Sequence, residues 1–424
     1  MSLYGNKQKT VMSNKTNTPQ IRFPEFSGEW EKKRLGDIAI FLKGKGIPKA
    51  DISENGKTEC IRYGELYTHY SEVIDEVISK TDVSIDNLVF SKANDVIVPA
   101  SGETQIDIAT ASCVLRAGVA LGGDLNIIRS EINGIYLSYY LNNAKKKSIA
   151  RLSQGISVVH LYPSQLKTLS LNLPSLPEQE KIASFLTAVD ERIELLQKKK
   201  EKLEEYKKGV MQKLFSQEIR FKDENGNDFP EWEEKRLGEV GKTYNGLTGK
   251  TKIDFGEGEP YIQYLQIFTN SKINTKEFGL VNIGENENQS KVQYGDVFFT
   301  TSSETPNEIG TASVLLEEVN KVYLNSFCFG FRPNSLIELV PDFSRYLFRS
   351  EQFRRIIIKL AQGSTRFNMS KVELMKLKIL LPKKEEQDKI ASFLTSLDDK
   401  IDIISKEIEQ SNYYKKGLLQ KMFV

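Results

Sequence analysis

EQEKIASFLT at residues 178–187 returns almost unchanged as EQDKIASFLT at residues 386–395. The match runs without a gap from residues 150–215 onto residues 358–423, where YKKGVMQKLF becomes YKKGLLQKMF. A repeat of roughly 200 residues is far longer than a solenoid unit. Each copy is therefore predicted to be a whole domain with its own connecting element, and the molecule is predicted to be pseudo-twofold.

Shorter repeats precede this segment in each copy. EWEKKRLGDI at 29–38 returns as EWEEKRLGEV at 231–240, IRYGELYT at 61–68 as IQYLQIFT at 262–269, and DVIVPASGET at 95–104 as DVFFTTSSET at 296–305. Such β-branched and aromatic runs, separated by Gly, Asn, Asp and Ser, predict short strands and turns. Trp30 and Trp232 are predicted to be buried at the start of a strand, and short helices are predicted at residues 135–151 and 342–360.

Each copy ends in a heptad pattern. Apolar residues recur at alternating steps of four and three, downstream of Pro177 and of Pro382. A period of 3.5 held for about five heptads predicts a coiled-coil seam. Its members are Ile182, Leu186, Val189, Ile193 and Leu196 in the first copy and Ile390, Leu394, Leu397, Ile401 and Ile404 in the second. The two helices are expected to pack on each other; the alternative is that each packs only on its own domain.

Composition bounds the class of protein. Among 424 residues, 39% are hydrophobic and 27% charged, and no apolar run approaches the roughly 20 residues of a membrane span, so no membrane partner is expected. The first twenty residues are polar and resemble a disordered leader, in which Met12 is a candidate natural start. Three widely spaced cysteines and two histidines favour neither disulfides nor a metal site, which points to the cytoplasm.

Positive charge is concentrated at matching places in the two copies, although the net charge is only +2. Residues 143–167 hold five cations and no acid, and residues 343–371 hold seven cations against Glu351. One such cluster alone would favour a solvated helix face, but two clusters at equivalent places favour phosphate contacts. The candidate cations are Lys145, Lys146, Lys147, Arg151, Arg354, Arg355, Lys359, Arg366 and Lys371.

A loop beside each cluster differs between the copies, although its flanks match. Turn-forming Gly155 and Gly363 lead into these loops, which hold polar side chains suited to base edges and phosphates. The further candidates are Gln154, Ser157, His160, Gln362, Ser364, Thr365 and Asn368. Two readers of different sequences would need such divergence, and free drift of surface loops would also produce it.

Catalytic motifs are incomplete. NGLTGKT at residues 245–251 imitates a phosphate-binding loop, but Tyr244 stands where that motif requires glycine. FLKGKGIPK at residues 41–49 lacks the third glycine of a dinucleotide site. The chain is therefore predicted to be non-catalytic, with no metal and no cofactor of its own.

Taken together, these segments resemble the specificity subunits of Type I restriction-modification enzymes. The order EWEKKRLG, IRYGELYT, DVIVPASG, SQG and LNLPSLPEQEKIASFLTAVDERI resembles a target-recognition domain, and the resemblance covers about residues 21–424. It implies binding to double-stranded DNA, with each domain reading one half of a split asymmetric target and the helices fixing the gap. Its implied partners are two modification subunits, which carry S-adenosylmethionine and methylate adenine, and two restriction subunits, which use ATP and Mg²⁺.

The expected fold is α+β, with two duplicated mixed α/β target-recognition domains separated by two long antiparallel coiled-coil helices. The predicted boundaries are a leader at 1–20, the recognition domains at 21–173 and 219–381, and the spacer helices at 174–218 and 382–424. KKEEQ at 383–387 replaces SLPEQ at 175–179, which predicts a different start for the second helix. Alternatives are a Type IIB-like specificity subunit, a non-DNA binding scaffold, or a self-sufficient nuclease or methyltransferase.

Overall fold

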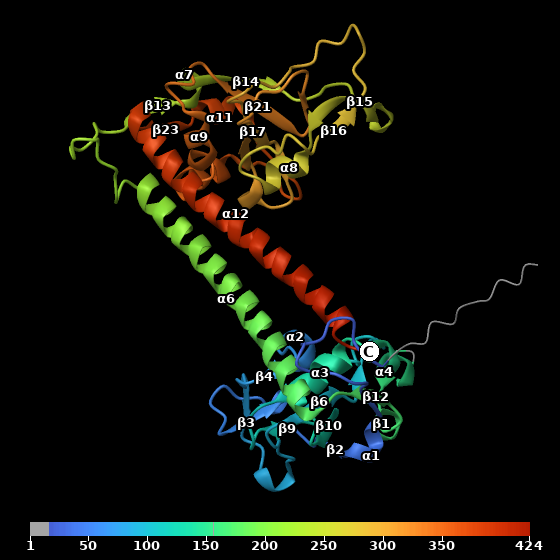
Figure 1. Cartoon of the computed structure of the whole chain (residues 1–424). Coiled ribbons are helices and arrows are strands. Elements are labelled where there is room, and N and C mark those ends of the chain that lie inside the picture. The colour runs from blue at the N-terminus through green and yellow to red at the C-terminus, as the bar shows by residue number, and fades with distance from the viewer. Residues whose placement is uncertain (1–16, 156) are drawn as a thin grey trace, which may run out of the picture. The chain divides into compact units, whose positions relative to one another are not determined.

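The computed structural model describes residues 17–155 and 157–424. It divides into two compact units (Figure 1). The first unit comprises the described residues up to Gln197 together with Lys406–Val424, and the second comprises Lys198–Ser405. Each unit therefore holds one copy of the repeat, the beginning of the long helix that follows it, and the end of the other copy's helix. Of the predicted leader, residues 1–16 lie outside the described residues, and the Asn17 carbonyl accepts a hydrogen bond from the Trp30 amide at 2.9 Å.

The two copies follow similar element orders, which differ in a few short strands and 3-10 helices. The first copy contains β1 (Glu31–Arg34), α1 (Leu35–Ile38), β2 (Ala39–Lys43), η1 (Lys49–Asp51), β3 (Thr58–Ile61), α2 (Glu65–Thr68), β4 (Val73–Ile74), β5 (Ser79–Thr81), η2 (Ile85–Asn87), β6 (Asp95–Pro99), β7 (Ser101–Gly102), β8 (Ser112–Val114), β9 (Ala120–Leu121), β10 (Leu125–Ser130), α3 (Gly134–Asn142), α4 (Lys146–Leu152), β11 (Val159–His160), α5 (Pro163–Leu166), β12 (Ser170–Leu173) and α6 (Leu176–Phe215). The second contains β13 (Glu233–Arg236), α7 (Leu237–Val240), β14 (Gly241–Asn245), η3 (Lys252–Asp254), β15 (Phe255–Ile262), α8 (Tyr264–Thr269), β16 (Gly279–Val281), β17 (Val297–Thr300), β18 (Ser302–Ser303), η4 (Pro306–Glu308), β19 (Ala312–Val314), β20 (Tyr323–Leu324), β21 (Cys328–Pro333), α9 (Pro341–Leu347), α10 (Glu351–Ile357), η5 (Ile358–Leu360), β22 (Phe367–Asn368), α11 (Lys371–Lys376), β23 (Lys378–Leu381) and α12 (Lys384–Lys421).

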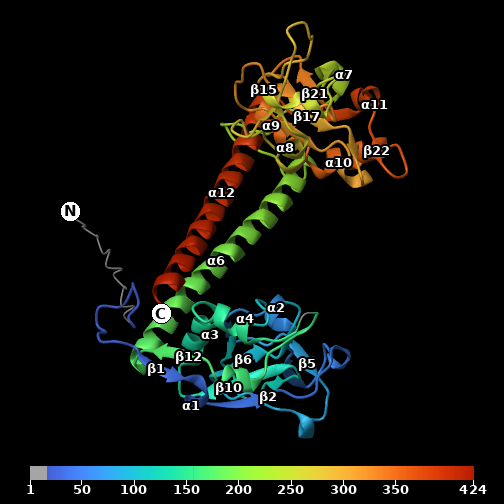
Figure 2. The ribbon, with the colours of Figure 1, turned by 90° about the vertical axis from the view of Figure 1, so that its right-hand side faces the viewer.

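The principal sheets have matching strand orders. In the first unit the order is β2-β10-β6-β8-β4, and in the second it is β14-β21-β17-β19. Smaller sheets, β5-β3-β9 and β16-β15-β20, accompany them. Every strand pair in the two principal sheets is antiparallel except β4 with β8. Figure 2 shows β2, β6 and β10 side by side in the first unit.

The repeated EQ pair fastens each long helix to the domain that precedes it. The Glu178 carboxylate accepts from Arg22 at 2.8 and 2.7 Å and from the Trp30 indole at 3.3 Å. Glu386 likewise accepts from Arg220 at 3.1 and 2.8 Å and from the Trp232 indole at 3.1 Å. Both tryptophans are buried, as the sequence predicted, with 2% and 8% of their surface exposed. The next residue in each copy, Gln179 or Gln387, accepts from the backbone N–H of Asn133 or Val340.

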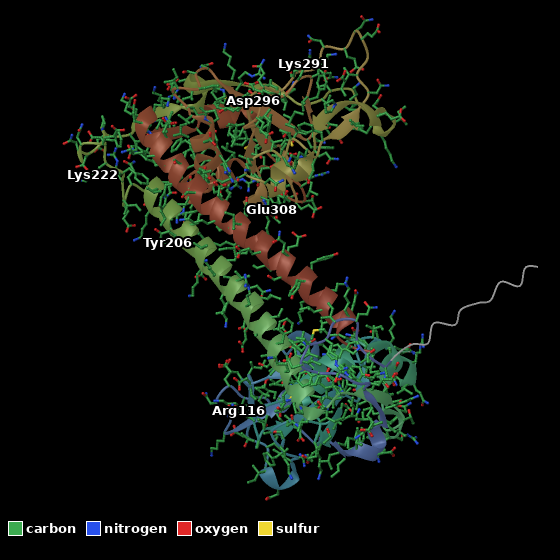
Figure 3. All side chains as sticks on the ribbon, viewed as in Figure 1. Arg116, Tyr206, Lys222, Lys291, Asp296 and Glu308 are labelled. Carbon is green, nitrogen blue, oxygen red and sulfur yellow. The ribbon has the colours of Figure 1, made fainter. Side chains whose placement is uncertain are left out.

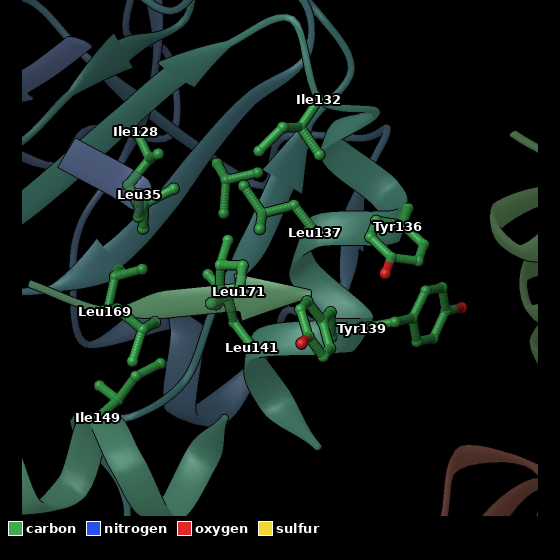
Figure 4. Close-up of a cluster of buried hydrophobic side chains, with 14 of the residues drawn as sticks. Leu35, Ile128, Ile132, Tyr136, Leu137, Tyr139, Leu141, Ile149, Leu169 and Leu171 are labelled. Atoms are coloured by element: carbon green, nitrogen blue, oxygen red, sulfur yellow. The ribbon is translucent and has the colours of Figure 1, made fainter. Parts of the chain in front are cut away.

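Each domain core also receives the end of the other copy's long helix. In the first unit, Leu418 of α12 and the following Met422 and Phe423 belong to the cluster that contains Ile182 and Leu186 of α6. The Phe423 ring lies 5.4 Å from that of Tyr140. Figure 4 shows α3 and β12 side chains of the same cluster. In the second unit, Leu214 and Phe215 of α6 belong to the cluster that contains Ile390, Leu394 and Leu397 of α12. This packing explains why the sequence at the end of the long helix, YKKGVMQKLF in the first copy, is repeated in the second.

An ion pair fixes the antiparallel register of the helices within each unit. In the first unit, Lys415 Nζ of α12 lies 2.7 Å from Asp190 Oδ1 of α6. In the second, Lys207 of α6 pairs with Asp398 of α12, and these are the equivalent positions of the repeat. Of the remaining predicted seam residues, Ile193 and Ile404 are buried, and Val189, Leu196 and Ile401 are half-buried.

Two local predictions require correction. The second long helix does not start differently: α6 begins at Leu176 and α12 at Lys384, which are equivalent positions. The helical stretch predicted at 135–151 is divided into α3 and α4, and that predicted at 342–360 into α9, α10 and the short η5. In the second copy the division occurs at Ser350, whose hydroxyl accepts from the Phe353 amide at 3.2 Å and so caps a new helix, α10.

Candidate nucleic-acid interface

A short hairpin in each copy carries the divergent loop. In the first, the amides of Gln154 and His160 each donate to the other residue's carbonyl, at 2.9 and 2.7 Å. In the second, Gln362 and Asn368 do the same at 2.9 and 2.8 Å. The returning strands, β11 and β22, pair with β7 and β18, which lie in the repeated SGET and SSET segments. In both copies, therefore, the returning strand pairs with the start of its own hairpin on one side and with the SGET or SSET segment on the other.

Glycine is required where each hairpin turns. Gly155 and Gly363 have φ values of +121° and +127°, a region in which L side chains are strained. A Cβ atom on Gly155 would lie 2.0 Å from the Val158 carbonyl oxygen, and one on Gly363 would lie 2.2 Å from that of Arg366. Both hairpins therefore require glycine at this position, because a side chain there would meet backbone of the same hairpin.

We expect Gly363→Ala to open the second hairpin at a cost of about 1–3 kcal/mol, because it adds both a strained φ and a backbone clash. Hydrogen exchange should then show loss of protection at the amides of Gln362 and Asn368. Gly209→Ala is the control, since nothing lies within 4 Å of its Cβ in α6, and it should leave that protection intact. Unchanged exchange in the Gly363 variant would contradict the turn geometry.

A cleft lies beside each hairpin. That of the first unit has a volume of about 660 Å³ and is lined by Tyr63, Gly64, Tyr67, Thr68, Ser101, Gly102, Glu103, Asp107 and Val158. That of the second has a volume of about 440 Å³ and is lined by Tyr264, Phe268, Ser302, Ser303, Glu304, Glu308, Phe327 and Arg366. Most of the lining positions correspond between the copies, so the cleft is itself part of the duplication.

Aromatic rings form one wall of each cleft. Tyr63 and Tyr67 meet edge to face at 6.4 Å, whereas Tyr264 and Phe268 stack at 6.1 Å. The Tyr67 hydroxyl donates to the Ser101 carbonyl at 3.0 Å, and that of Tyr264 donates to the Ser302 carbonyl at 2.9 Å. Burial raises the pKa of both phenols, so they remain neutral donors at neutral pH.

Carboxylates also line each cleft. Asp107 accepts from the Thr104 hydroxyl at 2.5 Å, and Glu308 accepts from the Ser303 hydroxyl at 2.9 Å. Figure 3 labels Glu308 in the second unit. Carboxylate oxygens can accept hydrogen bonds from the exocyclic amine of cytosine. The sequence prediction missed these residues; the signal for the aromatic ones was the repeat of IRYGELYT as IQYLQIFT, whereas Asp107 and Glu308 lie just beyond the repeated DVIVPASGET segment.

The predicted loop residues gather at the hairpins. Gln154, Ser157 and His160 are exposed on the first, and the His160 ring stacks on that of Tyr162 at 6.2 Å. On the second, the exposed residues are Gln362, Ser364, Thr365, Arg366 and Asn368.

The predicted cations of the first copy lie on or beside α4. Lys147 and Arg151 are exposed, and Lys146 is half-buried. Lys145 lies with its amine 5.1 Å from the centre of the Tyr140 ring, and burial lowers its pKa. The helix immediately precedes the hairpin, which leaves Lys147 and Arg151 beside the loop.

The predicted cations of the second copy do not all face solvent. Arg354 donates at 2.9, 2.8 and 2.7 Å to the carbonyls of Gly310, Asn307 and Ile309, and burial lowers its pKa. The geometry therefore gives it a role in holding that loop, and a phosphate contact by Arg354 stays a prediction. The other cations lie elsewhere: Arg355 pairs with Glu351, Lys371 donates to Asn245, and Lys359 is exposed.

Across residues 17–155 and 157–424, there is no group of three or more His, Cys, Asp and Glu side chains placed to hold a metal ion. None of the helices in this described part is long and apolar enough to cross a membrane.

Comparison with known proteins places both copies in one family. Residues 27–205 and 230–412 match the model of the Type I restriction modification DNA specificity domain. The specificity subunit of the Type I restriction enzyme MjaVIII of Methanocaldococcus jannaschii is 26% identical over 424 residues, which cover 94% of this chain and 92% of that protein.

Solved structures show the same fold. The S subunit of a Type I restriction-modification system from M. genitalium superposes with a TM-score of 0.58 at 18% identity, covering 96% of this chain and 99% of that one. A chain solved in work on complex assembly and conformational transition of the type I R-M system gives 0.55 at 17% identity, covering 93% and 97%. Because the family model matches most of the chain, once in each copy, the protein belongs to the Type I restriction-modification DNA specificity family.

Proposed function

We propose that each copy reads one half of a split, asymmetric DNA target through its hairpin and cleft. The observation that carries this proposal is the duplicated cleft, which keeps its hairpin glycine and strand pairing and changes part of its lining, with Val158 in the first copy and Arg366 in the second. Two related clefts that differ in some of their lining side chains suit two half-sites of different sequence. Exposed Lys147 and Arg151 beside the first hairpin add the phosphate attraction that a DNA reader needs.

The proposed division of labour assigns the chemistry to partners. Two modification subunits would carry S-adenosylmethionine and methylate adenine, and two restriction subunits would use ATP and Mg²⁺; this chain would bind none of these cofactors. Docking on the long helices is supported by a groove of about 400 Å³ between α6 and α12 in the first unit. Its lining includes Phe185, Val189 and Tyr414, and the neighbouring Tyr413 is exposed over 81% of its surface. Large exposed aromatic side chains favour a protein partner.

Reconstitution tests the function. We expect the chain alone, with S-adenosylmethionine and Mg²⁺, neither to methylate nor to cut DNA. Adding the modification subunit should produce adenine methylation at a split sequence, which sequencing of methylated DNA will identify. The modification subunit alone is the control and should give no such pattern. Methyl transfer by the chain alone, or an uninterrupted target, would refute the proposal.

A further inference from the structure

We propose that Arg366 reads a guanine in the half-site bound by the second copy, whereas Val158 contacts a thymine methyl group in the half-site bound by the first. This inference rests on the proposed function and adds the chemistry of one base in each half-site. Arg366 and Val158 occupy the same position of the repeat, and each lines the cleft of its own unit.

The equivalence of the two positions is fixed by backbone. Each residue's carbonyl oxygen faces the glycine of its own hairpin. A Cβ atom placed on Gly363 would lie 2.2 Å from the Arg366 oxygen, and one placed on Gly155 would lie 2.0 Å from the Val158 oxygen. The strand residue after Arg366 pairs with Ser303, and the one after Val158 pairs with Gly102. Since the two residues hold the same place against the glycine and beside the paired strand, the exchange of valine for arginine changes the side chain presented at one equivalent position of the two clefts.

Arg366 differs from the other arginines of the second basic cluster because its guanidinium is not committed elsewhere. Arg349 and Arg354 donate to backbone carbonyls, and Arg345 pairs with Asp398. Within the part of the chain that the structure describes, the Arg366 guanidinium donates no hydrogen bond to protein. It lies over Phe327, 6.0 Å from the ring centre.

The Phe327 ring acts as a platform for this guanidinium. Its backbone is anchored, because its carbonyl accepts from the Thr301 amide at 3.0 Å and its amide donates to Asn325. The ring itself is 56% exposed. An arginine held over an aromatic face, with its donors free, is suited to the paired O6 and N7 acceptors of guanine in the major groove.

Val158 presents the opposite chemistry. Its side chain is 53% exposed at the edge of a cleft whose other lining side chains are mainly hydroxyls, phenols and carboxylates. An isopropyl group offers no hydrogen bond, so it cannot select a base by donors or acceptors. The C5 methyl group of thymine is the apolar feature that the major groove presents to such a side chain.

The test uses the complex with the modification subunit, and duplexes carrying the target found by methylation sequencing. Replacing each half-site guanine in turn by 7-deazaguanine removes one acceptor, and replacing each thymine by uracil removes only the methyl group. At one guanine of the second half-site, 7-deazaguanine should weaken wild-type binding about 5- to 10-fold, whereas Arg366→Ala should be insensitive to it. At one thymine of the first half-site, uracil should weaken wild-type binding about 4-fold and leave Val158→Ser unaffected.

Two further variants separate reading from charge. Arg366→Lys keeps the positive charge but loses the planar pair of donors, so its response to 7-deazaguanine should lie between that of the wild type and that of Arg366→Ala, because an ammonium can still reach one acceptor. Arg355→Ala removes an exposed cation outside the cleft and should keep the full wild-type sensitivity.

The outcomes are distinguishable. If Arg366→Ala weakens all duplexes equally and keeps the response to 7-deazaguanine, Arg366 contacts phosphate and the inference is overturned, although the proposed function stands. If uracil weakens binding of the Val158→Ser complex as much as it weakens binding of the wild type, the assignment of Val158 to a thymine is overturned. If the wild-type complex methylates no split target, the proposed function itself fails.

Discussion

Glu386→Ala is expected to destabilise the second unit by about 3–5 kcal/mol, the range for removing one partner of a buried ion pair. The Glu386 side chain is fully buried and accepts hydrogen bonds from Arg220 and from the Trp232 indole. Its loss leaves the indole N–H of Trp232 without its acceptor and removes the two carboxylate contacts of the half-buried Arg220, which keeps its hydrogen bond to the Pro230 carbonyl. The helix start would also lose its attachment to the domain that precedes it.

The two tryptophans of the chain allow this to be measured, since each lies at the equivalent node of one unit. In a Trp30→Phe background, the fluorescence of Trp232 reports urea unfolding of the second unit. With an m-value of about 2 kcal/mol/M, the midpoint should fall by about 1.5–2.5 M. Glu385→Ala changes the adjacent, exposed carboxylate and should cost less than about 1 kcal/mol. Equal midpoints for the two variants would show that the node does not hold the helix.

The features that were predicted correctly from the sequence are those that show as a repeat or as a regular spacing of apolar residues. Doubling of EQEKIASFLT indicated two equivalent domains, and the heptads placed Ile182, Leu186, Ile390 and Leu394 at positions that prove to be buried. A strand-rich domain with a buried tryptophan followed from the same kind of local pattern. The clefts were missed because Tyr63 and Glu103 come together only when α2 and β7 meet, which no local periodicity records.

Charge was the least reliable guide. Arg354 and Arg366 are both cations in one basic run, yet one is committed to backbone carbonyls 44 or more residues away and the other is free at a cleft. Sequence alone cannot separate these roles, because the acceptors of Arg354 belong to a loop that the fold brings beside it. For the same reason, the helix start at Lys384 was mispredicted: buried Glu386 fixes it, and KKEEQ retains that residue.

Duplicating residues 201–204 in α6 together with residues 401–404 in α12, so that both long helices grow equally, is expected to lengthen the unspecified gap of the DNA target by one or two base pairs while both half-site sequences stay the same. Four residues add about 6 Å of helix and turn the chain by about 400°, so the downstream residues return close to their original face. Residues 201–204 lie between Asp190 and Lys207, the α6 members of the two interhelical ion pairs, and away from the packed helix ends.

Sequencing of methylated sites from cells that express this variant with its modification subunit measures the gap directly. Duplicating only residues 201–202 is the matched control, because two residues turn the downstream helix by about 200° and place its apolar face away from the partner helix. That control should lose methylation altogether. Because the proposed reading of each half-site depends on the hairpin and cleft alone, the four-residue variant should change the gap and nothing else in the target. An unchanged gap with full methylation would mean that the long helices do not set the distance between half-sites.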